Sequence, residues 1–368
     1  MDTTEITSSR RAHPGADLPE RLRRPTRWTT VGAALAAAGG LGALIAGLTG
    51  HGTTSSEAYP SVSLTMGLPV AHVSLLLAAA AALVSAGLLA LGAIARAVGR
   101  GRAPAGRTPA RTVLAVGIPA IAVGALMTTC DANPLALAGY LPAVLIGSVF
   151  SAHWREILVS MPAVELGSQL VLAAVVIVAV VATLRAVDAL RGHEPLPDWQ
   201  QPAAAARWGR TAVAVAVAIP LLYAVTRILW VLGFPIGFDA EAYAATGGDV
   251  NNGLILAVGA LVGAVLTIGL VRPWGERFWP WFPGLGGRRV PVGLAVVPAS
   301  IVAALILPAG VSMIVATTGQ LGIASIGELM DNWAALGVTF LWPIWSLALA
   351  VATWAYALRR RQDSVLVA

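Results

Sequence analysis

Long apolar runs are the feature that most limits how this chain can fold. A helix that crosses the hydrocarbon core of a bilayer needs about 20 apolar residues. Eight runs reach roughly that length, at 30–50, 68–95, 112–129, 165–184, 211–234, 253–271, 291–317 and 333–357. Charged residues make up only 11% of the chain, against about 25% in soluble domains. The sequence therefore predicts an all-α integral membrane protein with eight transmembrane helices.

The distribution of positive charge decides whether a ninth apolar run, 134–151, also crosses the membrane. All 24 basic side chains are arginines, and an excess of arginine marks the cytoplasmic loops of membrane proteins. With eight spans, 22 of the 24 arginines lie on the side of the N-terminus, whereas a ninth span would move eleven of them to the other side. We therefore expect 134–151 to be a re-entrant or interfacial segment on the outer side. It is interrupted by Pro134, Gly139, Pro142 and Gly147.

The same arginine count predicts a plasma-membrane protein whose N- and C-termini are both cytoplasmic. Residues 1–29 mix Arg, Asp, Glu, Pro and Ser and are expected to form a disordered cytoplasmic tail. Residues 359–368 form the second tail. Between the tails we expect a first four-helix unit at 30–184, a cytoplasmic linker at 185–210 and a second four-helix unit at 211–358.

Four short matches suggest that the two units are an internal repeat. They recur in the same order, about 180 residues apart. The matches are Arg27-Trp28 with Arg207-Trp208, EAY from Glu57 with EAY from Glu241, LAVGIPA from Leu114 with LAVVPAS from Leu294, and VAT from Val181 with VAT from Val351. Because each unit has an even number of spans, the sequence predicts parallel repeats related by an axis along the membrane normal.

Arg227 is the one charged residue well inside a predicted span, and an intramembrane charge is a functional-site hypothesis by default. In one interpretation its side chain reaches the outer headgroups or pairs with Asp239 or Glu241. In the other, Arg227 forms an anion or carboxylate site that opens outward. The side chains that would line this site are Tyr223, Thr226 and Trp230.

Four acids on the outer side form a quasi-symmetric set if the repeat is real. Glu57 corresponds to Glu241, and Glu165 corresponds to Glu328. Glu165 and Glu328 each begin the last span of their unit, where a carboxylate stabilises a helix N-terminus. The alternative is a cation or proton site between the two halves.

The segment 272–289 places five aromatic side chains between two groups of arginines, in the order RPWGERFWPWFPGLGGRR. Aromatic rings with basic neighbours are typical of the headgroup level of a bilayer. We expect an interfacial anchor along the cytoplasmic surface, with a platform for a substrate or partner as the alternative.

Two rows of small residues at spacing four predict close helix packing in the membrane. The first row is Gly39, Ala43 and Gly47, and the second is Gly259 and Gly263.

No motif indicates a metal, a cofactor or a nucleic-acid partner. HExxH, GxSxG and P-loop signatures are absent from the sequence, and the single cysteine, Cys130, excludes an intrachain disulfide. His51, His72 and His153 lack a companion ligand at metal-binding spacing. The arginines flank apolar runs, as orientation signals do, rather than forming a phosphate-binding face.

Two stretches resemble a known group of proteins. They are TRILWVLGFPIGFDAEAY at 226–243 and RPWGERFWPWFPGLGGRRVP at 272–291. With the Ala- and Arg-rich, lysine-free composition, they resemble multi-pass membrane proteins of unknown function from actinobacteria. The resemblance implies a plasma-membrane protein of a GC-rich bacterium, and it brings no activity and no functional residue.

Three classes of function therefore stay open. The first is a small-molecule carrier or binding protein with an outward-facing site between the halves, near Arg227. The second is a non-catalytic accessory or regulatory subunit, and the third is a membrane-embedded enzyme. The expected partners are the lipid bilayer and either another membrane protein or a second copy of the chain.

Overall fold

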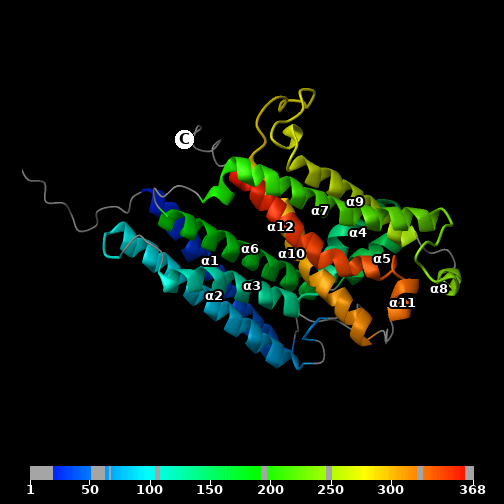
Figure 1. Ribbon diagram of the computed structural model, residues 1–368. Coiled ribbons are helices and arrows are strands. Elements are labelled where there is room, and N and C mark those ends of the chain that lie inside the picture. Colours follow the sequence, from blue (N-terminus) through cyan, green and yellow to red (C-terminus); the bar gives the residue numbers. More distant parts are fainter. Residues whose placement is uncertain are drawn as a thin grey trace, which may run out of the picture.

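The computed structural model describes residues 20–50, 63–65, 68–103, 108–161, 163–191, 197–245, 251–320 and 326–360. Within these residues every regular element is a helix (Figure 1). The described ranges contain one isolated antiparallel bridge, between Arg277 and Arg289, and no strand. The prediction of an all-α protein is confirmed.

Of the nine described helices with at least 18 residues, all but α4 form two groups of four. The first group is α1 (Glu20–Leu48), α2 (Val70–Gly99), α3 (Pro109–Thr129) and α6 (Ala163–Arg191). The second group is α7 (Pro202–Val231), α9 (Asn251–Gly269), α10 (Val292–Val315) and α12 (Trp342–Arg359). In the first group α1 packs on α2 and α6, and α3 packs on α6; in the second, α7 packs on α9 and α12, and α10 packs on α12. Figure 1 shows the two groups side by side, and α10 contacts α3 and α6 across the junction.

The remaining elements, of which α4 is as long as α12, connect these helices. They are α4 (Asn133–Phe150), α5 (Ala152–Ser160), η1 (Asp198–Gln200), α8 (Ala240–Ala245), η2 (Pro273–Gly275), η3 (Ala316–Gln320), α11 (Ile326–Asp331) and η4 (Gly337–Leu341). Helices α6 and α7 extend into the predicted linker, and α1 begins inside the predicted N-terminal tail.

Eight helices of the described chain are long and apolar enough to cross a membrane. This number agrees with the sequence prediction, but the members differ. Asn133–Phe150 belongs to the set, whereas Gly253–Gly269, with 17 residues, is shorter than the others. At 1.5 Å per residue that apolar stretch is about 26 Å long, a little less than the roughly 30 Å of a hydrocarbon core.

The expectation that proline and glycine interrupt 134–151 is wrong. Helix α4 is continuous through Pro142, and Pro134 lies in its first turn. Proline in the first turn costs no helical hydrogen bond, and an internal proline removes only one. In apolar surroundings the other backbone groups have no better partner than the helix.

Helices α4 and α5 leave and rejoin the first group at the same end. Asp131, which follows α3, accepts a hydrogen bond of 3.0 Å from Nε2 of Gln169 in the second turn of α6. The end of α3 and the start of α6 are therefore adjacent. Helix α5 folds back on α4, where a Cβ added at Gly147 would lie 2.6 Å from Cγ of Trp154.

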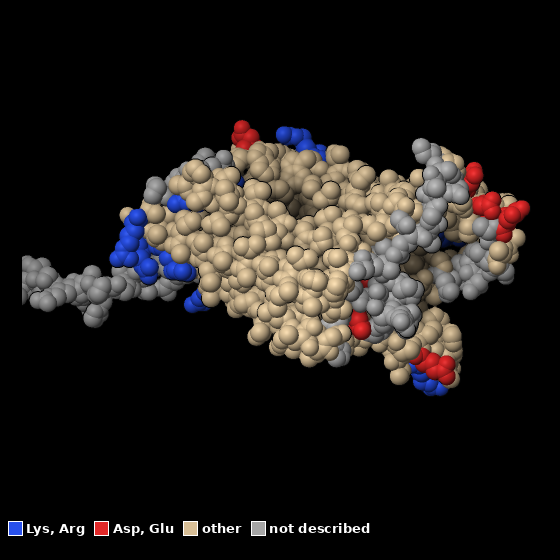
Figure 2. Space-filling view, turned by 90° about the horizontal axis from the view of Figure 1, so that it is seen from below, with Lys and Arg blue, Asp and Glu red and all other residues tan. Residues whose placement is uncertain are grey.

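Charged side chains separate toward opposite ends of the molecule. Figure 2 shows most of the visible arginines at one end and most of the acids at the other. We call these the arginine end and the acid end. The arginine end comprises the end of α2, the start of α3, the end of α6, the start of α7, the loop after α9 and the end of α12.

Helices α1 and α2 approach each other most closely at glycines. A Cβ added at Gly40 would lie 2.8 Å from Cβ of Ala81, and one at Gly47 would lie 2.5 Å from Cβ of Ser74. Of the predicted row, Gly47 therefore lies at a close helix contact, whereas a Cβ added at Gly39 would meet only Cγ2 of Val175, at an ordinary 3.7 Å. The row on α9 differs, because added Cβ atoms at Gly259 and Gly263 would meet no atom of the described chain within 4 Å.

Replacing Gly40 by leucine should destabilise the protein, because the side chain has no space between α1 and α2. We expect Gly40→Leu to lower the free energy of unfolding by about 1–3 kcal/mol, measured as a lower thermal midpoint in detergent micelles. Gly42→Leu is the matched control, since a Cβ there meets nothing within 4 Å. Equal midpoints for the two variants would contradict the packing described.

Candidate functional site

Arg227 lies near the acid end of α7 and is half-buried. Its Nη1 donates a hydrogen bond of 3.0 Å to the carbonyl oxygen of Ala334, and its Nη2 donates one of 3.4 Å to that of Ala335. Both carbonyls belong to the loop between α11 and η4. The same loop is bound from its other side, because the backbone N–H of Ala334 donates to the carbonyl of Gly237 at 3.0 Å.

Two aromatic rings of α7 flank the guanidinium. Cζ of Arg227 lies 4.5 Å from the ring centroid of Tyr223 and 4.0 Å from that of Trp230. The spacing of four and three residues places the three side chains on one face of the helix. Both distances fall in the range of cation–π attraction. The structure thus brings together three of the four side chains that the sequence suggested for this site.

Thr226, the fourth of these side chains, does not face Arg227 as a ligand group. It is buried, and its hydroxyl donates to the carbonyl of Tyr223 at 2.8 Å. This bond to the preceding turn of its own helix satisfies a buried hydroxyl locally.

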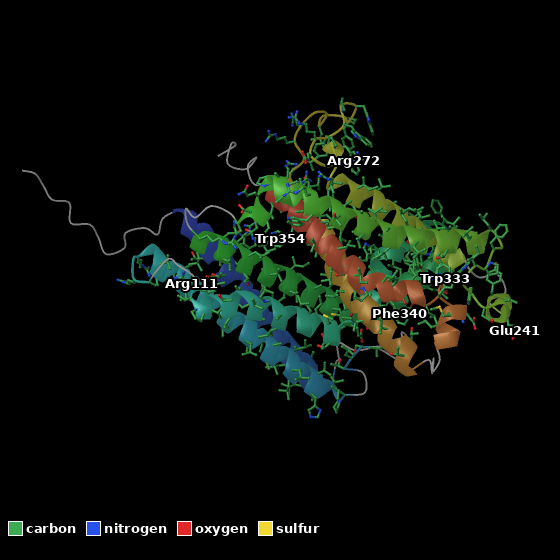
Figure 3. All side chains as sticks on the ribbon, in the orientation of Figure 1. Arg111, Glu241, Arg272, Trp333, Phe340 and Trp354 are labelled. Carbon is green, nitrogen blue, oxygen red and sulfur yellow. The ribbon has the colours of Figure 1, made fainter. Side chains whose placement is uncertain are left out.

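The two acids suggested as partners of Arg227 form no ion pair with it among the described residues. Asp239 and Glu241 are exposed, and Figure 3 shows Glu241 on α8 at the edge of the molecule. No carboxylate among the described residues forms an ion pair with Arg227. Within the described part of the chain, carbonyl dipoles and ring faces attract its positive charge.

Three further helices enclose Arg227. A Cβ added at Gly253 of α9 would lie 3.2 Å from its Cδ. Tyr140 of α4 interacts electrostatically with Arg227 and Tyr223. The ring of Tyr223 also makes an edge contact with Trp342 of α12, with centroids 6.3 Å apart. Residues of α4, α7, α9 and α12 therefore lie around this site, with α9 contributing the backbone at Gly253.

Buried hydrogen-bond donors without a partner lie on the neighbouring helices. Nε1 of Trp342, Nε1 of Trp345 and Oγ of Ser312 are buried and have no hydrogen-bond partner within the described chain. An indole N–H can only donate. Most buried polar groups are paired, so each exception needs an explanation. Sequence analysis missed these groups because indoles also suit a plain apolar core.

The predicted outer acids do not form one described cluster. Glu57 lies outside the described residues, and Glu165 occupies the first turn of α6 as expected. Glu328 does not begin the last span, because it lies in α11, which a loop separates from α12. The described residues contain no group of three or more His, Cys, Asp or Glu side chains that could hold a metal ion.

Asp131 is a buried acid that sequence analysis overlooked. It is 1% exposed. Its Oδ1 accepts from the N–H of Asn133 at 2.8 Å, its Oδ2 accepts from Gln169, and its own N–H donates to Oε1 of Gln169 at 3.2 Å. These bonds join α3, α4 and α6. In the sequence, Asp131 is a lone acid between two apolar runs. Ordinary loops show the same pattern, so it does not reveal that the acid is buried.

Cys130 directly precedes Asp131 and is buried. Burial and, to a smaller extent, the neighbouring Asp131 together raise the pKa of its thiol to about 12. The thiol is therefore protonated at physiological pH and is not a nucleophile.

The segment 272–289 forms a loop that α12 holds in place. Arg359 pairs with Glu276 at 3.0 Å, and the hydroxyl of Tyr356 donates to the carbonyl of Gly275 at 2.9 Å. The aromatic side chains at the tip stay accessible, with Trp281 69% exposed. Figure 3 places Arg272 at the base of this loop, at the arginine end. Its role as an interfacial anchor stays a prediction.

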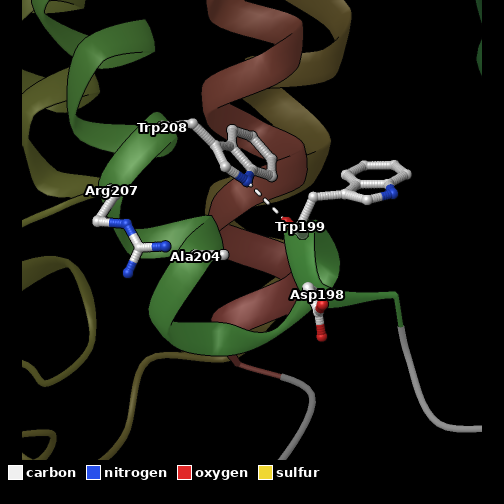
Figure 4. A pocket seen from close by; sticks show the side chains of 5 residues that line it. All are labelled: Asp198, Trp199, Ala204, Arg207 and Trp208. Atoms are coloured by element: carbon white, nitrogen blue, oxygen red, sulfur yellow. Dashed lines mark hydrogen bonds between the residues drawn. The ribbon is translucent and has the colours of Figure 1, made fainter.

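A shallow hollow of about 370 Å³ opens at the arginine end of α7. It is lined by Asp198, Trp199, Ala204, Arg207 and Trp208 (Figure 4). Sequence analysis assigned these residues to the linker and missed the hollow, because the bend at Gln201 between η1 and α7 and the ring contacts with Trp354 of α12 shape it.

Comparisons of the chain with protein-family models, with curated proteins and with solved structures give no match. No functional residue can be transferred from a relative.

Removing the partner of the buried Asp131 should destabilise the fold. We expect Gln169→Leu to cost about 1–3 kcal/mol, because Oδ2 of the buried Asp131 loses its donor while Oδ1 keeps the N–H of Asn133. Thermal unfolding in detergent measures this. Gln201→Leu is the control, since it removes an exposed bond of the same kind, Gln201 to Asp198 at 3.0 Å. An unchanged midpoint for Gln169→Leu would show that the buried bonds do not stabilise the junction.

Proposed function

We propose that this multi-pass membrane protein binds or carries a small organic or inorganic anion at Arg227. The observation that carries the proposal is a half-buried guanidinium with no carboxylate partner among the described residues. An uncompensated charge at membrane depth is costly, and such residues mark substrate pathways. A bound anion would supply the missing counter-charge.

The hydrogen-bond donors at this site suit an anionic ligand. A guanidinium has five N–H donors, and the two carbonyl contacts of Arg227 leave others unused. The unpartnered indole N–H of Trp342, whose ring contacts that of Tyr223, is a further donor beside this site. The aromatic rings beside Arg227 shield part of the guanidinium from water, and a charge-assisted hydrogen bond is stronger where water is scarce. A carboxylate or phosphate group matches this chemistry better than a cation does.

We further infer that the site opens outward between two repeated units, with the arginine end in the cytoplasm and both termini cytoplasmic. The arginine distribution supports this orientation. Because α4 and α5 leave and rejoin the first unit at the acid end, an outer segment at 134–151 agrees with it. Tyr140 then contributes to the site from the first unit and Arg227 from the second.

Matching contacts support the tandem repeat. The tryptophan of each Arg-Trp pair packs on the last helix of its own unit: Trp28 lies under Arg185 of α6 at 4.6 Å, and Trp208 lies 5.9 Å from Trp354 of α12. In each VAT match the threonine is buried and donates to the carbonyl four residues earlier, at 2.8 Å for Thr183 and 2.7 Å for Thr353. The first unit has no counterpart of Arg227, so the second unit is specialised at this site.

A second candidate, a non-catalytic accessory subunit, is favoured by one contact. Arg227 already holds the loop at Ala334 and Ala335, so its role can be to fix that loop for a partner protein. The two candidates differ in what they predict for an added anion.

The anion proposal is tested with purified protein in detergent. Acetate, benzoate and inorganic phosphate are titrated separately, and binding is followed by calorimetry and by the thermal midpoint. We expect at least one anion to bind saturably and to raise the midpoint. Arg227→Gln should weaken its affinity by about tenfold or more, the size of a lost charged hydrogen bond.

Two variants serve as controls. Arg185→Gln removes the other arginine that stacks on a tryptophan, at the opposite end of the helices, and should leave anion affinity unchanged. Arg227→Lys keeps the charge and should retain part of the affinity. Equal affinity of wild type and Arg227→Gln, or failure of all three anions to bind, would contradict the proposal and favour the accessory role.

A further inference from the structure

The hollow at the arginine end has a wall fixed by three indoles. Nε1 of Trp208 donates to the carbonyl of Trp199 at 2.9 Å, which joins η1 to α7. The ring of Trp354 on α12 lies 5.3 Å from that of Trp199 and 5.9 Å from that of Trp208. Trp199 remains 50% exposed. The hollow, about 370 Å³, is within the usual range of roughly 300–1,000 Å³ for small-molecule sites.

One acid and one base stand on the rim of this hollow. Figure 4 shows the side chains of Asp198 and Arg207 on either side of Ala204, extending toward the same side. Both residues are exposed, and they form no ion pair with each other in the described chain. Nε2 of Gln201 donates to Oδ1 of Asp198 at 3.0 Å and holds that carboxylate in place. The rim therefore offers separated charges of opposite sign over an apolar floor.

The place of the hollow points to lipid. It lies where α7 begins, on the end that carries most arginines, and exposed tryptophan is typical of the membrane–water interface. Lipid headgroups occupy this level. A headgroup that carries both a phosphate and an ammonium would complement both rim charges.

We propose that this hollow binds the headgroup of phosphatidylethanolamine. The phosphate contacts the guanidinium of Arg207, and the ammonium donates to the carboxylate of Asp198 beside the face of Trp199. Phosphatidylglycerol has no cation for Asp198 and brings a net negative charge toward it. Phosphatidylcholine has a cation without N–H donors, so it cannot hydrogen-bond the carboxylate. The proposal is independent of the anion site at Arg227.

Native mass spectrometry of the purified protein in detergent tests this selectivity. Equal amounts of phosphatidylethanolamine, phosphatidylglycerol and phosphatidylcholine with identical acyl chains are added. The fraction of the protein that retains each lipid is then measured. We expect phosphatidylethanolamine to be retained in preference to the other two. Arg207→Gln should reduce its retention about fivefold to tenfold, as expected for one charge-assisted contact at a part-exposed site.

The variant Asp198→Asn tests the role of the acidic side chain separately from that of Arg207. It should abolish the preference for phosphatidylethanolamine over phosphatidylglycerol while phosphate binding to Arg207 persists. Arg210→Gln, which removes an exposed arginine of α7 that does not line the hollow, is the control and should change nothing. The thermal midpoints of all variants show that each protein is folded.

Three results would overturn the proposal. They are equal retention of the three lipids by the wild type, an unchanged preference in Asp198→Asn, and the same loss in Arg210→Gln as in Arg207→Gln. Displacement of the lipid by millimolar free phosphoethanolamine would show that the hollow is a site for the soluble zwitterion instead.

Discussion

The cost of placing a charged side chain in hydrocarbon is the constraint on which this structure depends. It leaves the long helices with few charges, so they pack through small residues such as Gly40 and Gly47 against α2. It also moves the arginines to helix ends. There they bind loops, as Arg359 does with Glu276, or lie on aromatic rings, as Arg185 does on Trp28. Helix packing and the ordering of loops thus share one physical cause.

Arg227 is the exception, and its surroundings show how an intramembrane charge is tolerated. Two ring faces and two backbone carbonyls attract the cation without neutralising it. The same contacts join the acid end of α7 to the loop before η4. A site built in this way holds its guanidinium in a fixed orientation before any ligand arrives, which reduces the entropy lost on binding. That preorganisation is why an anion site is our proposal rather than a structural contact alone.

The sequence predicted the helices well because apolar length and arginine position are local, one-dimensional signals. It also placed Tyr223 and Trp230 beside Arg227, since helical spacing alone sets that face. It failed where contacts between distant segments decide. Helix α4 stays continuous because apolar surroundings favour the helical hydrogen bonds that Pro142 leaves intact. The pairing of Asp131 with Gln169, the separation of Glu328 from α12 and the hollow at Trp199 all arise from tertiary packing that no short pattern encodes.

The orientation that arginine imposes is tested most directly by labelling single cysteines in intact cells with a membrane-impermeant maleimide. In a Cys130→Ala background, Arg102→Cys reports the arginine end and Asp239→Cys reports the acid end, and both positions are exposed. The account predicts that residue 239 is labelled in intact cells and residue 102 only after lysis. Labelling of residue 102 in intact cells, or protection of residue 239, would contradict the orientation and the outer placement of α4.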